Sequence, residues 1–463
     1  MDDDAAASRI TPRAFLTRTL ASPANDRFIT DDRTRLPLDA LRSATCFAAP
    51  LDRFRGKAVM LATNRQLPTV MSALMLDGVA GRLYFCTPDC HDRLSAIVAA
   101  AEVDAIVADQ PLRFDGAGVS VIACDEPTPY ALVPTARDVP TEWVLFTSGT
   151  TGLPKMVVHT LASLSGPLDD GVFVANGSVW STFYDIRRYG GMQIMLRALL
   201  GGGSLVLSSA DEATGAFLHR AQAAAVSHIS GTPSHWRRAL MHAEAADFAP
   251  RYVRLSGETA DQMILDRLRA AFPQAGIAHA YASTEAGVGF DVRDGLAGFP
   301  ASFIPQPDGH AGIELKVENG TVHIRSARVA SGYLGSHELR LHDGFIDTGD
   351  IVERHGDRYY FIGRREGVIN VGGQKVFPEE VENVLTRHQD VLAARVWSRK
   401  NPVTGAVVAA ELMLQASAQE AFPAIVEALV FNCRNSLAPY KVPATWRRVD
   451  KIEMTAAGKV KRA

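Results

Sequence analysis

Short apolar runs alternate with helical patterns over the first part of the chain. Between Lys57 and Asp109, strand-like runs such as AVMLA and RLYFCT are separated by a helical stretch, DRLSAIVAAAEV. The same alternation resumes through GSLVLSS, FLHRAQAAAV, RYVRLSG, ADQMILDRLRAAF and IAHAYAS. This order of elements predicts a large α/β body in which helices cover mostly parallel sheets.

The pattern changes after residue 290. In GIELKVENGTVHIRS, two alternating strands flank Asn319-Gly320, a dipeptide that favours the positive φ angles of a tight hairpin. FPEEVENVLTRH then predicts a short helix that begins at Pro378, and further strands and a longer helix follow it. We therefore expect a β-barrel-like part and then a small α+β domain of about 100 residues, an ordinary domain size. The predicted domains are an N-terminal domain over 1–364 and a mobile C-terminal domain over 365–463.

Composition and charge narrow the class of protein. The 463 residues exceed one ordinary core, since roughly 150 residues per domain is usual. An apolar content of 47% with 21% charged residues is typical of a globular enzyme and argues against a disordered or coiled-coil chain. The net charge of −3 provides no basic surface for nucleic acid or an anionic membrane. The acidic start, MDDDAAASRI, and the absence of an apolar run of about 18 residues predict a cytoplasmic protein.

The five cysteines are odd in number and mostly far apart, which favours reduced thiols over a disulfide framework. Cys86, Cys90 and His91 together could suggest zinc, but no fourth ligand follows at a recognisable spacing. We therefore interpret these cysteines as buried thiols.

The most unusual stretch is LFTSGTTGLPKMVVHT, where glycines and hydroxyls follow an apolar strand. Glycines let the backbone approach a ligand closely, and hydroxyl and amide hydrogens suit phosphate oxygens. A Walker loop is disfavoured, because Lys155 follows Leu153-Pro154 and Met156 replaces the Mg²⁺-binding hydroxyl. The simpler alternative is a polar surface turn. The candidate phosphate-binding residues are Thr147, Ser148, Gly149, Thr150, Thr151, Gly152 and Lys155.

Several further stretches follow in a fixed order. They are LSGET (255–259), YASTE (281–285), GFIDTGD (344–350), GRREGVINVGGQKVF (363–377) and VDKIEMTAAGKVKRA (449–463). With the glycine-rich stretch, they resemble in type and order the adenylate-forming enzymes, which include acyl-CoA and aryl-CoA ligases, adenylation domains of peptide synthetases and luciferases. The resemblance covers nearly the whole chain and is weakest over the first 50 residues.

This resemblance implies a site for ATP and Mg²⁺. Tyr281 would stack on adenine, because a purine needs a flat apolar face. Thr284 would contact the α-phosphate, and Glu285 would hold Mg²⁺, since a hard cation suits a carboxylate oxygen. Ala282 stands where the family usually has glycine, which could narrow the neighbouring acyl pocket.

The resemblance also implies how the nucleoside is held. The backbone of Gly257, Glu258 and Thr259 would wall the adenine. Asp350 would accept hydrogen bonds from both ribose hydroxyls, because a carboxylate has two oxygens suited to a vicinal diol. Arg364 would contact the ribose or a phosphate. The simpler interpretations of these residues are a strand-end turn and an exposed turn aspartate.

The last two stretches imply a moving domain. Glu366 stands at the family's hinge position, usually an aspartate, and Gly372 and Gly373 would let backbone pass close to a pantetheine arm. Lys459 matches the catalytic lysine, whose ammonium would stabilise charge that grows on the α-phosphorus. Taken alone, a lysine near a chain end is usually just a solvated charge.

The implied reaction has two steps. A carboxylic acid attacks ATP to give acyl-AMP and pyrophosphate, and the small domain then turns so that a thiol attacks the acyl carbon. CoA is the first choice for the thiol, and the phosphopantetheine of a carrier protein is the alternative. A non-catalytic nucleotide-binding homologue is the rival from another class, against which Lys155, Glu285, Asp350 and Lys459 argue.

The acid is less well determined. In the family, the pocket for the acyl group is lined between the phosphate loop and the Tyr281 motif, here STFYDIRRYGGMQ and HISGTPSHW. Arg187 or its neighbour Arg188 could pair with a polar or acidic substituent, and the alternative is an exposed basic loop. The candidate acyl-pocket residues are Tyr184, Arg187, Tyr189, His235 and Ala282. They suit an aromatic or small acid better than a long alkyl chain.

Overall fold

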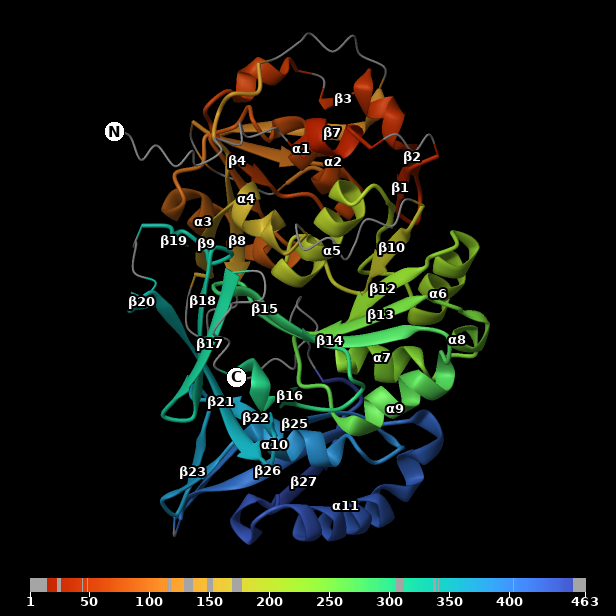
Figure 1. Cartoon of the computed structure of the whole chain (residues 1–463), viewed down its shortest axis with the longest axis vertical. Coiled ribbons are helices and arrows are strands. Elements are labelled where there is room, and N and C mark those ends of the chain that lie inside the picture. Colours follow the sequence, from red (N-terminus) through yellow and green to blue (C-terminus); the bar gives the residue numbers. More distant parts are fainter. Residues whose placement is uncertain are drawn as a thin grey trace, which may run out of the picture. The chain divides into compact units, whose positions relative to one another are not determined.

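The computed structural model describes residues 15–452, except for 23–25, 44, 48, 113, 115, 117, 129–135, 148–152, 169–176, 305–311, 336–338, 340 and 403. The chain forms two compact units (Figure 1). Unit 1 comprises residues 1–212, 223–226 and 328–338, and unit 2 comprises residues 213–222, 227–327 and 339–463. Each unit is described by itself below.

Unit 1 is built on an eight-stranded mixed sheet whose central strands β8, β5, β4 and β6 are parallel. These central strands are almost entirely buried, because helices cover them. Across the sheet the strands are β19 (Gly332–Tyr333), β9 (Lys155–Thr160), β8 (Glu142–Thr147), β5 (Arg82–Phe85), β4 (Ala58–Leu61), β6 (Ala105–Ala108), β7 (Ser120–Thr128) and β3 (Thr45–Phe47). The helices near this sheet in Figure 1 are α1 (Phe15–Leu20), α2 (Gln66–Leu76) and α3 (Leu94–Ala100).

A second group of strands in unit 1 carries the segment that the sequence assigns to the acid. Its strands β10 (Val179–Thr182) and β1 (Phe28–Thr30) both pair in parallel with β11 (Ser204–Val206). Strand β2 (Arg35–Pro37) closes this group in antiparallel orientation. The helices are α4 (Leu161–Ser165) and α5 (Tyr189–Leu200), and α5 is largely buried.

Unit 2 begins with three parallel strands and an antiparallel return strand. Strands β12 (His228–Gly231), β13 (Tyr252–Ser256) and β14 (Gly276–Ser283) are parallel, and β15 (Gly287–Val292) pairs with β14 in the opposite direction. The helices are α6 (Thr214–Ala223), α7 (Pro233–Ala239), α8 (Glu244–Asp247) and α9 (Gln262–Ala271). The carboxyl ends of β13 and β14 carry the LSGET and YASTE residues, as expected for a ligand site on parallel strands.

An antiparallel sheet follows in unit 2. Its order is β16 (Phe299–Pro300), β22 (Arg358–Arg364), β21 (Phe345–His355), β18 (Thr321–Ser326) and β17 (Ile313–Glu318), with β20 (Leu341–His342) paired to β21. The predicted hairpin is confirmed: Glu318 pairs with Thr321, and Asn319 and Gly320 have φ angles of 51° and 77°.

The last part of unit 2 is the small α+β domain that the sequence predicts. It contains β23 (Ile369–Val371), β24 (Gln374–Val376), α10 (Pro378–Leu385), β25 (Val391–Asn401), β26 (Gly405–Leu414), α11 (Phe422–Ser436) and β27 (Thr445–Arg448). One apolar core joins the hairpin, both helices and the three-stranded sheet, with Val381, Val408 and Leu429 at its centre. The predicted fold class is therefore confirmed, while the boundary at residue 365 stays a prediction.

The structure also bears on membrane-spanning helices and on the cysteine thiols. Within the described ranges, none of the helices has the length and apolar character that crossing a membrane requires. All five cysteines lie in the described part of the chain, and each is buried and outside any disulfide.

Candidate active site

Three of the predicted ATP-binding side chains meet in unit 2. Tyr281, on β14, donates its phenol hydrogen to Asp350 Oδ2, on β21. Arg364, at the end of β22, donates from Nε to the other carboxylate oxygen over 2.8 Å. Asp350 and Arg364 are partners in the antiparallel register of β21 and β22, which brings these two together. The cluster therefore presents an aromatic ring, a carboxylate and a guanidinium from three strands.

Burial and neighbouring charges shift the pKa values of Tyr281 and Arg364 so that both groups keep their protons. Burial, together with the charge of Asp350, raises the pKa of Tyr281 well above its usual value, so the phenol stays protonated and donates. The charge of Asp350 raises the pKa of Arg364, and the charge of Glu285 adds to this effect. Glu285, in the turn after β14, therefore lies within electrostatic reach of the same cluster.

Two phenylalanines that the sequence analysis did not select hold the Tyr281 ring. Phe361, on β22, stacks on it with ring centroids 4.8 Å apart and an interplanar angle of 12°. Phe290, its register partner on β15, stacks with centroids 5.5 Å apart. The aromatic residues in RYYFIGR and GVGFDV could have indicated such packing. These contacts fix the plane of the ring that is predicted to face adenine.

A β-bulge next to Tyr281 makes room for this packing. The register between β14 and β15 shifts between Tyr281 and Ala282, so Gly289 is the extra residue on β15. A Cβ atom at Gly289 would lie 3.1 Å from Tyr281 Cδ1, which is tighter than ordinary packing. Glycine at this place therefore keeps the tyrosine ring in position.

The LSGET residues lie on and directly after β13, the strand next to β14. Ser256 pairs with Ala280, and continuing this register by one residue places Gly257 next to Tyr281. Gly257 has a φ of 84°, a conformation that favours glycine. The Glu258 side chain accepts a hydrogen bond of 2.9 Å from Ser234 N in the first turn of α7. The side chain of Glu258 thus serves a helix end, which leaves the backbone of 257–259 for the predicted adenine wall.

Thr284 and Glu285 occupy a tight turn between β14 and β15. The Ser283 hydroxyl accepts a 2.9 Å hydrogen bond from Ala286 N and closes this turn. Both residues are half-buried. The turn holds them at the carboxyl end of β14, on the same strand end as Tyr281.

The described ends of the predicted phosphate loop lie in unit 1. Thr147, the last residue of β8, is the antiparallel register partner of Lys155, the first residue of β9. Lys155 is exposed, and its Nζ lies 5.5 Å from the centre of the Tyr333 ring. The predicted loop residues Ser148, Gly149, Thr150, Thr151 and Gly152 lie outside the described residues. The loop therefore connects two adjacent strands of one sheet.

Arg187, the arginine that the sequence analysis assigns to the acid, is buried and paired within unit 1. The side chain of Arg187 is 1% exposed and forms a bidentate pair with Asp185, Nε–Oδ1 at 2.8 Å and Nη2–Oδ2 at 2.6 Å. It also donates to the carbonyl oxygen of Thr63 after β4. Burial opposes ionisation of Asp185, but the charge and hydrogen bonds of Arg187 outweigh it and lower the pKa of that carboxyl. Arg187 therefore anchors its own loop to the parallel sheet.

Removing Arg187 is expected to destabilise the fold. In Arg187→Ala, the Asp185 carboxylate loses its counter-ion, and breaking a buried pair in this way costs about 3–5 kcal/mol. Urea unfolding at pH 7.5 measures the change. Exposed Arg42, paired with Asp39 at 3.2 Å, provides the control, because Arg42→Ala should change stability by less than about 1 kcal/mol. Equal stabilities of the two variants would contradict a structural role for the buried pair.

The two tyrosines assigned to the acyl pocket are also buried in unit 1. Tyr184 precedes α5 and packs against Gly190, where an added Cβ would lie 3.5 Å from the tyrosine ring. Tyr189 begins α5, and its ring centre lies 5.8 Å from that of buried His159. Both rings therefore belong to the segment that leads from β10 into α5.

His235, in unit 2, takes part in a helix cap. Its Nδ1 accepts a 3.1 Å hydrogen bond from Thr232 N, while His235 N donates to Thr232 Oγ1, which forms a capping box at the start of α7. Burial, with a smaller contribution from Arg238, lowers the pKa of His235 to about 3. The imidazole is therefore neutral and stabilises the helix start near Glu258.

This lowered pKa predicts a pH-dependent stability. Because the unfolded chain takes up the histidine proton near pH 6.5 and the folded chain only near pH 3, stability should fall as the pH drops between these values. The slope from this group is about 1.4 kcal/mol per pH unit. His235→Gln keeps an acceptor for the capping box and should lose less stability between pH 7.5 and 4.5 in thermal unfolding. Identical losses in both proteins would contradict the assignment.

The hinge and thiol residues lie in the small domain and its connection. Glu366 is exposed in the turn that follows β22. Gly372 and Gly373 form the turn between β23 and β24 with φ angles of 55° and 86°, which side chains rarely adopt. Lys459 lies outside the described residues. The glycines thus form a hairpin turn without side chains.

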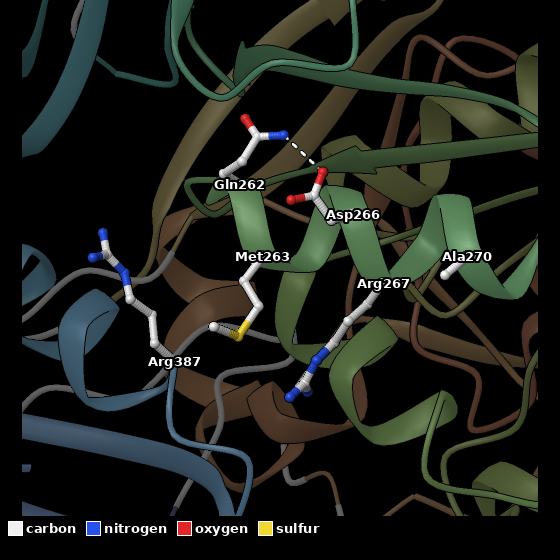
Figure 2. Close-up of a pocket in the computed structure, with 6 residues that line it drawn as sticks. All are labelled: Gln262, Met263, Asp266, Arg267, Ala270 and Arg387. Carbon is white, nitrogen blue, oxygen red and sulfur yellow. Dashed lines mark hydrogen bonds between the residues drawn. The ribbon is translucent and has the colours of Figure 1, made fainter. Parts of the chain in front are cut away.

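An open groove lies elsewhere in unit 2, along the exposed face of α9 (Figure 2). Its volume is about 590 Å³. It is lined by Gln262, Met263, Asp266, Arg267, Ala270 and Arg387, and Gln262 donates to Asp266 over 2.9 Å. None of the predicted site residues that the structure describes lines this groove, so it is separate from the Tyr281 cluster.

Comparison with known proteins identifies the family of the chain. The model of the AMP-binding enzyme family matches residues 89–334, and that of the AMP-binding enzyme C-terminal domain matches residues 380–459. A 2-succinylbenzoate–CoA ligase of Bacillus velezensis is 27% identical over 398 residues, which cover 81% of this chain and 75% of that protein. The ligase of the same name from Staphylococcus aureus is 24% identical, with 87% and 84% of the two chains covered.

Solved structures share the fold. Anthranilate CoA ligase AuaEII in complex with anthranoyl-AMP matches with a TM-score of 0.76 at 17% identity, covering 96% of this chain and 95% of that chain. ATP-bound MatB from Rhodopseudomonas palustris matches with a TM-score of 0.77 at 16% identity, covering 96% and 97%. The two family models together span more than half of the chain, and the predicted resemblance is confirmed. The chain therefore belongs to the AMP-binding enzymes and carries both the main domain and the C-terminal domain of that family.

Proposed function

We propose that the protein activates a carboxylic acid with ATP, releases pyrophosphate, and transfers the acyl group from acyl-AMP to CoA. The observation that carries the proposal is the cluster in unit 2, where Tyr281, Asp350 and Arg364 combine a flat ring, a two-oxygen acceptor and a cation. A ribose diol would take the place of the Tyr281 and Arg364 hydrogens on the Asp350 carboxylate. The membership of the AMP-binding enzymes and the ligase names of the relatives support this reaction.

The first step would use the predicted phosphate-binding and catalytic residues. The loop between Thr147 and Lys155 would bind the β- and γ-phosphates, and Thr284 would contact the α-phosphate. Lys459 would lie between the acid and the α-phosphate, where its charge stabilises the transition state. The carboxylate oxygen would attack the α-phosphorus as the bond to pyrophosphate breaks, which gives acyl-AMP. The acyl group is then activated for the second step, because AMP is a much better leaving group than oxide.

Mg²⁺ would accompany ATP, with Glu285 as its protein ligand. In the described part of the chain, no three His, Cys, Asp or Glu residues gather as a metal site. A single carboxylate suits Mg²⁺, which is usually held by one or two carboxylates together with substrate phosphates and waters. The bound ion would supply positive charge that draws electrons away from the reacting phosphorus.

The second step would use the small domain. Rotation about Glu366 would remove Lys459 from the phosphate and present the turn at Gly372 and Gly373 to the pantetheine arm. The absence of side chains in this turn supports a close approach by a narrow ligand. CoA is favoured as the thiol because the relatives named above are CoA ligases. Transfer to the phosphopantetheine of an acyl or aryl carrier protein is the second candidate, since it presents the same thiol arm.

An aromatic or small acid is the proposed substrate class, with 2-succinylbenzoate, the acid named for the relatives, as the first compound to test. Tyr184, Tyr189, His235 and Ala282 would contribute to the pocket. Arg187 would pair with a substituent of the acid only by giving up Asp185. We also propose that the reaction takes place in the cytoplasm, where ATP and CoA are available.

One experiment tests the function. ATP–pyrophosphate exchange is measured with 2-succinylbenzoate, benzoates, anthranilate and short acyl acids, followed by mass spectrometry after addition of CoA or a phosphopantetheinylated carrier protein. Exchange with one acid class and a CoA thioester supports the proposal. A thioester on the carrier alone favours the second candidate. Nucleotide binding without exchange for any acid would indicate a non-catalytic homologue.

A further inference from the structure

Arg188 links the predicted acid segment to the strand that leads into the predicted phosphate loop, all within unit 1. It precedes α5, and its Nη1 donates a 2.7 Å hydrogen bond to the carbonyl oxygen of Phe146. Its Nη2 donates to both carboxylate oxygens of Asp89, at 2.9 and 3.2 Å. One side chain thus joins three segments that are far apart in the sequence.

The hydrogen bond from Arg188 to Phe146 lies next to the first predicted phosphate-binding residue. Phe146 is the second-last residue of β8, and Thr147, the first predicted phosphate-binding residue, follows it directly. A hydrogen bond from a charged guanidinium is shorter and stronger than one between neutral groups. The side chain of Arg188 is 11% exposed, so water competes little for these bonds. The guanidinium therefore fixes the direction in which β8 ends.

Arg188 also differs from its neighbour. The guanidinium of Arg187 donates hydrogen bonds to Asp185 and to the carbonyl oxygen of Thr63, and not to the end of β8. Arg188 Nε is buried and makes no hydrogen bond with any residue that the structure describes. Of these two arginines, Arg188 is therefore the one whose described contacts reach the end of β8.

We propose that Arg188 is a positioning residue for ATP: it holds the end of β8, so that Thr147, the first predicted phosphate-binding residue, keeps its place for the β- and γ-phosphates. The inference rests on the proposed function. Since Tyr184 and Tyr189 belong to the same segment as Arg188, the arginine also ties the acid segment to the end of β8. Asp89, in the 3-10 turn Pro88–Arg93, supports the guanidinium from the other side.

ATP and AMP distinguish positioning from a general loss of structure. AMP lacks the β- and γ-phosphates, so it does not depend on the loop. Arg188→Ala should weaken the binding of Mg-ATP about 10- to 100-fold, the range for losing a charged hydrogen bond, and leave AMP binding within about twofold. Isothermal titration calorimetry of the full chain without acid measures both affinities.

Arg82 provides the matched control at the other end of the same strand. Its Nε donates a 2.7 Å hydrogen bond to the carboxylate of Glu142, the first residue of β8. Arg82→Ala should change neither affinity. Asp89→Asn is a milder second variant at a half-exposed residue, and it should weaken ATP binding less than Arg188→Ala while sparing AMP.

Two outcomes would overturn the inference. Equal losses of ATP and AMP affinity in both Arg188→Ala and Asp89→Asn would show a general structural role, and unchanged ATP affinity in both would show no role at all. A wild-type protein that binds AMP but not ATP would instead refute the proposed function.

Discussion

Replacing Lys459 with alanine is expected to abolish ATP–pyrophosphate exchange while thioester formation from supplied acyl-AMP continues. The ammonium is proposed to stabilise charge on the α-phosphorus, and removing one such group usually lowers the rate by about 10²–10³-fold. The second step would take place after the small domain has turned and moved Lys459 away. The two half-reactions therefore respond differently to one substitution, and both rates are measured on the same protein preparation.

Lys461 is the matched control for this experiment. It lies two residues further along, in the same GKVKRA stretch, and carries the same charge. Lys461→Ala should retain exchange within a few-fold. If Lys459→Ala slows both half-reactions equally, or if Lys461→Ala matches its loss of exchange, the proposed division between the two steps is wrong.

Replacing Asp350 with alanine is expected to lower kcat/KM for ATP by about 100-fold or more, since each hydrogen bond to a charged group contributes about 1.5–3 kcal/mol and the ribose would lose two. The structure shows both carboxylate oxygens used, one by Tyr281 and one by Arg364. Tyr281→Phe keeps the ring that stacks on Phe361 and removes only the phenol hydroxyl, so it should change kcat/KM far less. Steady-state exchange kinetics with varied ATP measure both variants.

2′-Deoxy-ATP makes the Asp350 test specific. The wild-type enzyme should discriminate against it, because one hydroxyl partner of the carboxylate is missing. Asp350→Ala should show almost no further discrimination, since the group that reads this hydroxyl has been removed. The same penalty for the deoxy nucleotide in both proteins would mean that Asp350 does not bind the ribose.

The sequence predicted the fold class and the order of the functional stretches because both depend on local signals. Alternating strand and helix patterns, the Asn319-Gly320 turn and the helix start at Pro378 need only neighbouring residues, and the structure contains all three. The clustering of Tyr281, Asp350 and Arg364 followed from the family resemblance, which transfers a three-dimensional arrangement that periodicity alone does not contain.

The packing around Tyr281 and the partners of Arg187 and Arg188 depend on contacts between residues far apart in the sequence. The stack of Phe361 and Phe290 on Tyr281 and the room made by Gly289 depend on a bulge and on two sheets, and neither leaves a pattern within a few residues of Tyr281. Arg187 and Arg188 are adjacent and chemically identical in the sequence, yet one is committed to Asp185 and the other to Phe146 and Asp89. A charged side chain takes its role from the partner that compensates its burial, and that partner is chosen by the tertiary structure.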